Sequence, residues 1–255
     1  MDYLTGLFGL SGKTAVVTGG SRGIGQTVAL GLAQAGAAVA ILCRSEPEET
    51  LTQIAAAGGR AYHIAADVAD ETAVDAALTE VLRRSGSLDV VFNNAGICIH
   101  KPTVEATVDE WKRVLDVNLN GTYIVSRAAG RIMIENGIHG SIINNASMSG
   151  TVVNVPQWQC SYNASKAAVL HLTRSLAVEW ADYGIRVNSI SPGYTATAMS
   201  VDTPEELKNA WLPLIPMRRM GRPEELVGAV LYLASGASSY TTGADLIVDG
   251  GYVCR

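Results

Sequence analysis

Thr18-Gly19-Gly20-Ser21-Arg22-Gly23-Ile24-Gly25 separates a short apolar run from a segment whose apolar residues recur with helical spacing. Glycines in this turn let the backbone reverse sharply and approach a diphosphate closely, and the helix that follows offers unpaired N–H groups and the positive end of its dipole. An ordinary glycine-rich turn would look similar, but the strand–turn–helix context favours a dinucleotide site. The residues that we expect to bind it here are Gly19, Ser21, Arg22, Gly23, Ile24 and Gly25.

Strands and helices alternate along the rest of the chain. We expect strands near residues 13–17, 38–42, 62–65, 88–92, 140–144, 185–190 and 246–248, and helices after residue 25 and near residues 49–57, 73–84, 107–135, 160–181 and 223–233. Apolar strands that alternate with helices indicate a parallel sheet covered on both faces. The sequence therefore predicts one α/β domain over residues 1–255, a Rossmann-type doubly wound parallel sheet. Residues 194–222 are the least regular, and we expect them to form an excursion over the substrate site.

Charge and composition argue against several classes of protein. The chain has 255 residues and a formal net charge of −5, which disfavours nucleic acid as a partner. No segment approaches the ~18 uninterrupted apolar residues that cross a bilayer, and the N-terminus lacks the basic region of a secretory signal. The four cysteines and four histidines have no metal-ligand spacing. We expect a cytoplasmic protein without a metal, membrane or nucleic-acid partner.

The end of the second strand distinguishes the two common dinucleotides. An NAD site usually has a carboxylate there to hold the ribose 2′-hydroxyl. This sequence instead has Arg44 and Ser45, and Arg22 lies in the glycine-rich turn. Guanidinium groups pair well with a 2′-phosphate, which favours NADP(H) as the cofactor. Glu46 could reach back towards a ribose, so NAD(H) is the alternative, and both arginines could also be ordinary surface charges.

Two more turns follow strands at the same edge of the predicted sheet. Asp67, with Val68 beside it, is positioned to accept a hydrogen bond from an adenine amino group, or to cap a helix or shape a turn. Asn94, Ala95 and Gly96 either line the ribose path of the cofactor or build a tight turn. We include these five residues in the predicted cofactor site.

Tyr162 and Lys166 are the predicted centre of the chemistry. They lie four residues apart on a predicted helix, so their side chains share one face. The lysine ammonium could lower the pKa of the phenol from about 10, so that Tyr162 exchanges a proton with a carbonyl or an alcohol. Ser147 could hold the substrate oxygen, and Ser149 competes for that role. The alternative is an interface tyrosine beside a surface lysine.

The motifs, in their order and spacing, resemble the short-chain dehydrogenase/reductase family over nearly the whole chain. The segments that carry the resemblance are residues 18–25, Asn93-Asn94-Ala95-Gly96, Asn118, Ser147, Tyr162 with Lys166, Pro192-Gly193 with Thr197, and Val248-Asp249-Gly250-Gly251. The resemblance implies that Tyr162 is the acid/base, that Ser147 orients the substrate oxygen and that Asn118 holds a relay water. It implies that Lys166 lowers the pKa of the tyrosine and, with Tyr162, contacts the cofactor. The residues that it implies on the nicotinamide side are Pro192, Gly193, Thr195 and Thr197.

Within the family, residues 147–150 and 154–157 resemble the branch that acts on sugar alcohols and ketoses. The implied function is an NADP(H)-dependent oxidoreductase that interconverts a ketone and a secondary alcohol, and the implied assembly is a homotetramer. Candidate substrate residues are Ser149, Asn154, Gln157 and Trp158, although Trp158 could only pack a loop. The alternatives are an NAD-dependent polyol or deoxy-uronate dehydrogenase, a 3-oxoacyl thioester reductase, and a catalytically silent cofactor sensor.

Overall fold

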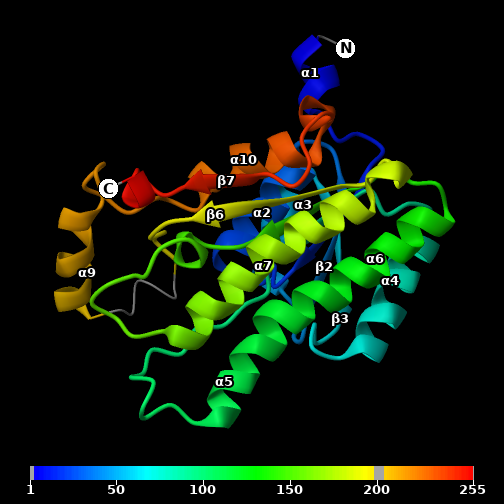
Figure 1. Ribbon diagram of the computed structural model, residues 1–255. Coiled ribbons are helices and arrows are strands. Elements are labelled where there is room, and N and C mark those ends of the chain that lie inside the picture. Colours follow the sequence, from blue (N-terminus) through cyan, green and yellow to red (C-terminus); the bar gives the residue numbers. More distant parts are fainter. Residues whose placement is uncertain (1–2, 198–203, 255) are drawn as a thin grey trace.

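A seven-stranded parallel sheet in the order β3-β2-β1-β4-β5-β6-β7 forms the centre of the molecule (Figure 1). The computed structural model describes residues 3–197 and 204–254. The strands are β1 (Thr14–Thr18), β2 (Ala38–Cys43), β3 (Arg60–Ala65), β4 (Val90–Asn93), β5 (Ser141–Asn145), β6 (Arg186–Pro192) and β7 (Asp245–Val248). The predicted doubly wound parallel sheet is therefore confirmed.

Helices cover both faces of the sheet and bury two apolar cores. The helices of eight or more residues are α2 (Gly23–Gln34), α3 (Glu48–Ala56), α4 (Glu71–Ser85), α5 (Val108–Leu115), α6 (Gly121–Glu135), α7 (Cys160–Glu179) and α10 (Glu224–Ala234). One core joins α4, α6 and α7 to the sheet around Leu78, Val125 and Leu176. The other joins α2, α3 and α10 to the opposite face around Leu32 and Val230. Burial on both faces explains why the central strands are almost uniformly apolar.

The strand order reverses next to β1. The chain runs from β1 outwards through β2 to β3, and then returns to pair β4 with the other side of β1. In an open parallel sheet, a crevice forms at the carboxyl ends of the strands where the order reverses. The fold therefore positions the turn after β1 and the turn after β4 next to each other.

Three features differ from the simple strand–helix alternation that the sequence predicts. The helix expected over residues 107–135 is interrupted by a π-helical turn, η1 (Asp116–Asn120). Short 3₁₀ turns also occur: η2 (Met148–Gly150), η3 (Ala181–Tyr183), η4 (Leu212–Leu214), η5 (Gly236–Ser238) and η6 (Tyr252–Cys254). The described part of the irregular stretch, 194–197 and 204–222, contains the helix α9 (Glu205–Trp211); residues 198–203 lie outside the described residues.

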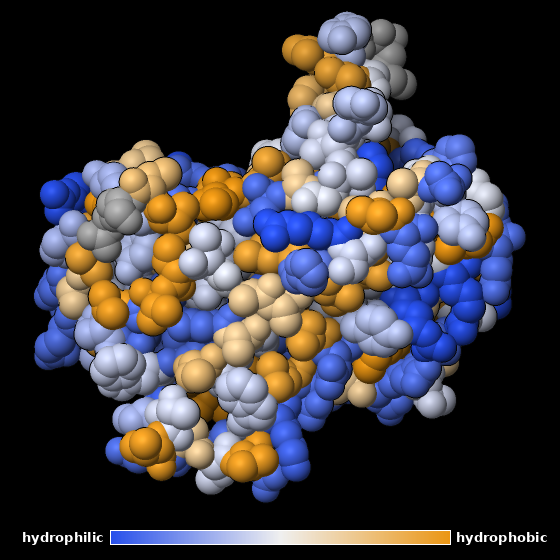
Figure 2. Space-filling view, in the orientation of Figure 1, coloured by the Kyte–Doolittle hydropathy of each residue, from blue (hydrophilic) through white to orange (hydrophobic). Residues whose placement is uncertain are grey.

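A short N-terminal helix, α1 (Tyr3–Phe8), projects from the body of the molecule (Figure 1). Figure 2 shows apolar side chains on this projection, where Tyr3 and Leu4 are exposed. In the described part of the chain, no helix combines the length and the apolar character that spanning a bilayer requires.

Candidate functional site

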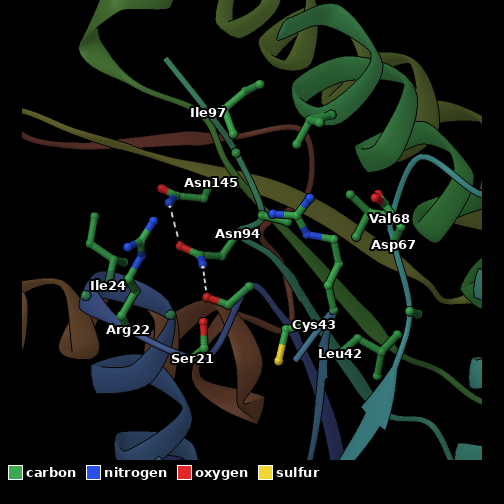
Figure 3. Close-up of a pocket in the computed structure, with 18 of the residues that line it drawn as sticks. Ser21, Arg22, Ile24, Leu42, Cys43, Asp67, Val68, Asn94, Ile97 and Asn145 are labelled. Carbon is green, nitrogen blue, oxygen red and sulfur yellow. Dashed lines mark hydrogen bonds between the residues drawn. The ribbon is translucent and has the colours of Figure 1, made fainter. Parts of the chain in front are cut away.

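A cavity of about 490 Å³ opens at the carboxyl ends of the strands beside β1 (Figure 3). Its walls come from the turns after β1, β2, β3 and β4, from α5 and η1, and from α7. The predicted cofactor residues that line it are Gly19, Ser21, Arg22, Gly23, Ile24, Gly25, Arg44, Ser45, Asp67, Val68, Asn94, Ala95, Gly96, Tyr162, Lys166 and Thr197. The lining residues that sequence reasoning missed are Leu42, Cys43, Ala66, Ile97, Arg113, Val117 and Asn145.

The glycine turn packs too tightly for side chains at two positions. Gly19 has a φ of 64°, and a Cβ there would lie 2.9 Å from the Cα of Ala95. A Cβ on Gly25 would collide with the side-chain amide of Asn94 and with the carbonyl of Gly19. The helix α2 begins directly after Arg22, whose side chain makes no capping hydrogen bond. The first N–H groups of α2 therefore face the cavity end of the turn without a side-chain cap.

Asn94 fixes the turn from the neighbouring strand. Its Nδ2 donates to the carbonyls of Thr18 and Gly19 at 3.0 and 3.1 Å. Its Oδ1 accepts from Asn145 Nδ2 at 3.0 Å (Figure 3). Both amide protons of Asn94 are thus used to hold the backbone, so this residue shapes the cavity as well as lining it.

The charge of the cavity lining is strongly positive. Arg22, Arg44, Arg113 and Lys166 line it, and Asp67 is the one carboxylate among the described lining residues. Glu46, the residue that could have favoured NAD(H), is exposed and is not part of this lining. Within the described part of the chain, the side chains of the three arginines have no ion-pair or hydrogen-bond partner. Guanidinium groups without a carboxylate partner in one cavity favour an anionic ligand.

The Asp67 carboxylate shapes a turn and does not cap a helix. Its Oδ1 accepts from the backbone N–H of Ala69 at 3.0 Å, whereas the N-cap of α4 is Asp70. Asp67 and Val68 nevertheless line the cavity together, as the adenine prediction requires.

Of the four predicted catalytic residues, Tyr162 and Lys166 line the cavity, whereas Ser147 and Asn118 are outside the described lining. Ser147 is hydrogen-bonded to Tyr162, and the Nζ of Lys166 lies 5.5 Å from the centre of the Tyr162 ring. Lys166 Nζ donates to the carbonyl of Asn145 at 2.6 Å. Asn118 is fully buried in the π-helical turn and is hydrogen-bonded to both backbone groups of Ile97, at 2.8 and 2.9 Å.

Burial controls the protonation of Tyr162 and Lys166. It raises the pKa of Tyr162 to about 12, and the hydrogen bond with Ser147 offsets part of that rise. It lowers the pKa of Lys166 to about 8. The sequence led us to expect a Tyr162 pKa lowered by Lys166; in this structure the pKa is raised instead, because the phenol loses water, and the Lys166 ammonium is hydrogen-bonded to the carbonyl of Asn145.

The candidate substrate residues do not line the cavity. Ser149, Asn154 and Gln157 are buried in a polar network, in which Asn154 and Gln157 both donate to the hydroxyl of Tyr194. Gln157 Oε1 also accepts from the indole of Trp211 at 2.8 Å. Trp158 is 59% exposed to solvent. The side-chain amides of Asn154 and Gln157 therefore already have hydrogen-bond partners within the protein. Sequence spacing could not predict this.

The predicted nicotinamide-side residues divide into two groups. Thr197 lines the cavity, whereas Pro192, Gly193 and Thr195 lie at and after the end of β6 and are outside the described lining. A Cβ on Gly193 would lie 2.6 Å from the Cα of Asp249, so this glycine allows close packing against the turn after β7. Among the described residues, no group of three or more His, Cys, Asp or Glu side chains could hold a metal ion.

A glycine turn at the reversal point of a parallel sheet, next to a Ser–Tyr–Lys group, defines a dinucleotide-binding oxidoreductase site. The family model described as "Enoyl-(Acyl carrier protein) reductase" matches residues 19–253. The chain belongs to the short-chain dehydrogenase/reductase family of oxidoreductases.

Curated relatives and solved structures match the chain over almost its full length. It is 47% identical to sorbose reductase SOU1 of Candida albicans, over 97% of this chain and 89% of that protein. It is 43% identical to the NADP-dependent mannitol dehydrogenase of Hypocrea jecorina, over 100% of this chain and 97% of that protein. A gluconate 5-dehydrogenase from Burkholderia cenocepacia, solved in complex with NADP and tartrate, is 37% identical with a TM-score of 0.92, over 99% of this chain and 100% of that one.

Proposed function

We propose that this protein is an NADP(H)-dependent oxidoreductase that interconverts a ketone and a secondary alcohol, with a ketose and its sugar alcohol as the substrate pair. The observation that carries the proposal is the joining of the Ser147–Tyr162–Lys166 group to the glycine turn by one cavity. The sorbose and mannitol activities in the names of two relatives support the substrate class.

The residues in the cavity fit a phosphorylated dinucleotide. The unpaired Arg22 and Arg44 carry two positive charges at the glycine turn and at the end of β2, where a 2′-phosphate would need them. The end of β2 has no carboxylate to repel that phosphate. The N-terminus of α2 would hold the diphosphate, and Asp67 would accept from the adenine amino group. The bound cofactor would supply or accept the hydride.

The protein's own groups would handle the proton. With a pKa of about 12, Tyr162 keeps its proton at neutral pH, and this is the form that donates to a ketone oxygen. Ser147, already hydrogen-bonded to Tyr162, would hold the same oxygen. The phenol O–H bond breaks as the alcohol O–H bond forms, which leaves a phenolate. The Lys166 ammonium, cationic below its pKa of about 8, would stabilise that phenolate.

Replacing Tyr162 with phenylalanine tests the proposed role directly. We expect Tyr162→Phe to lower kcat for ketose reduction about 10²- to 10⁴-fold, since it removes the proton donor and keeps the ring. The Kd for NADPH, measured by fluorescence titration, should stay nearly unchanged. The matched control is Tyr183→Phe, which alters a half-exposed tyrosine in η3. Near-normal turnover of Tyr162→Phe on every ketose that the wild type accepts would contradict the assignment.

Substrate and assembly are further parts of the proposal. A panel of ketoses, gluconate-type keto acids and 3-oxoacyl thioesters, assayed with NADPH and NADH, would separate the proposed substrate class from the alternatives. We also propose a homotetramer located in the cytoplasm. The exposed apolar side chains on the outer faces of α5, α6 and α7, such as Val108, Tyr123 and Val178, support self-association.

A further inference from the structure

Arg113 is a cationic cavity residue that the predicted cofactor site did not contain. It lies on α5, is exposed, and lines the same cavity as Arg22 and Arg44. The described part of the chain offers its guanidinium no carboxylate or other hydrogen-bond partner. Its neighbour Lys112 is also exposed but does not line the cavity. Arg113 and Lys112 are both cationic and exposed, so what distinguishes Arg113 from Lys112 is its position at the cavity.

Arg113 belongs to a stripe of residues spaced four apart, which continues through Val117 to Gly121. Val117 lines the cavity with Arg113, and a Cβ on Gly121 would lie 2.7 Å from Val68 Cγ2. The inner end of this stripe thus packs on the turn after β3. From that turn the stripe runs back through the π-helical turn η1 to Arg113 on α5, whose side chain is exposed.

This placement puts Arg113 on a different wall from the other two arginines. Arg22 comes from the turn after β1 and Arg44 from the end of β2. Arg113 comes from the wall that meets Val68, the residue next to Asp67. In the proposed function, Asp67 and Val68 contact the adenine base, whereas Arg22 and Arg44 contact the 2′-phosphate. Arg113 therefore lies on the side of the cavity that would face the adenine base.

We infer that Arg113 binds the adenine base and covers it from the α5 side of the cavity. A guanidinium group is planar and weakly hydrated, so it stacks well on an aromatic ring and needs no anion to do so. The inference rests on the proposed function, because it takes a dinucleotide as the occupant of the cavity. It adds a contact with the adenine base that does not depend on whether the cofactor carries a 2′-phosphate.

Three probes separate a base contact from a phosphate contact. We would measure the Kd of NADPH, NADH and 5′-AMP by isothermal titration calorimetry for the wild type, Arg113→Ala, Arg44→Ala and the control Lys112→Ala. Arg113→Ala should raise all three Kd values by about the same factor, roughly three- to tenfold. Arg44→Ala should raise the Kd of NADPH selectively. Lys112→Ala should leave all three at their wild-type values.

Each other result has a definite meaning. A selective loss of NADPH binding in Arg113→Ala would place this arginine at the 2′-phosphate and overturn the inference. Unchanged Kd values in Arg113→Ala would make it a surface charge and overturn it as well. If the wild type binds neither NADPH nor NADH, then the proposed function itself fails, whatever Arg113 does. Circular dichroism of Arg113→Ala should match the wild type, because the side chain is exposed.

Discussion

Tyr162 and Lys166 illustrate what residue spacing can and cannot predict. Their separation of four residues correctly predicted two side chains on one helix face, at the cavity. It did not predict their protonation, because a pKa depends on how much water each group loses, and this is set by residues distant in sequence. Asn145, which accepts from Lys166, is one such residue, and the sequence offered no motif to single it out.

The displaced pKa of Lys166 predicts the pH dependence of ketone reduction. Below pH about 8 the ammonium is charged and stabilises the phenolate, and above it the charge is lost. Tyr162 keeps its proton throughout, because its pKa is about 12. We expect kcat for reduction, measured at saturating NADPH, to be level below pH about 8 and to fall above it. Lys166→Met should lower kcat in the pH range where the wild-type kcat is constant, and it should abolish the decline of kcat at alkaline pH. A wild-type profile without any alkaline decline would count against this role of Lys166.

At the scale of elements, the π-helical turn η1 and the helix α9 were the parts that periodicity missed. Helical spacing over residues 107–135 fits one continuous helix, and one widened turn barely disturbs that pattern. The turn is instead explained by long-range contacts of Asn118, whose amide pairs with the backbone of Ile97. The helix α9 is held by Trp211, which stacks on Tyr194 at 4.2 Å between ring centres. Both depend on partners that no local pattern identifies.

The π-helical turn offers a matched pair of substitutions. Asn118→Ala removes a fully buried amide and the hydrogen bonds that it makes with the part-buried N–H and C=O of Ile97, so we expect the free energy of unfolding to fall by about 1–3 kcal/mol. The same change should reduce kcat, since Ile97 and Lys166 line the same cavity. Asn120→Ala is the control, because Asn120 is exposed and its side-chain amide donates to the carboxylate of Asp116 in the same turn. Urea unfolding of the two variants measures the difference. Equal stability of both would show that the Asn118 contacts do not hold the turn.

For the whole molecule, the alternation of apolar strands and helices was sufficient to predict the parallel sheet and both covered faces. Strand β1, for example, is buried at all five positions, as a central strand with two covered faces must be. The reversal of strand order beside β1 then explains why residues from the turns after β1, β2, β3 and β4 share one cavity. The polar network around Tyr194 was not predictable in this way, because it joins side chains from separate loops.

Ligand binding should stabilise the whole fold, and the choice of dinucleotide should be visible in that stability. A ligand that binds only the folded state adds RT ln(1 + [L]/Kd), about 2.7 kcal/mol at 100 times its Kd, or roughly 5–10 °C in Tm for a chain of this size. At equal concentrations NADPH should therefore raise the Tm more than NADH, because Arg22 and Arg44 have an extra phosphate to bind. Arg44→Asp should reverse that order, since a carboxylate repels the 2′-phosphate and accepts from a ribose hydroxyl. Arg60→Asp makes the same charge change at the start of β3, outside the cavity lining, and should keep the wild-type order. If differential scanning fluorimetry gave Arg44→Asp and Arg60→Asp the same order of Tm shifts, Arg44 would not be the residue that selects the cofactor.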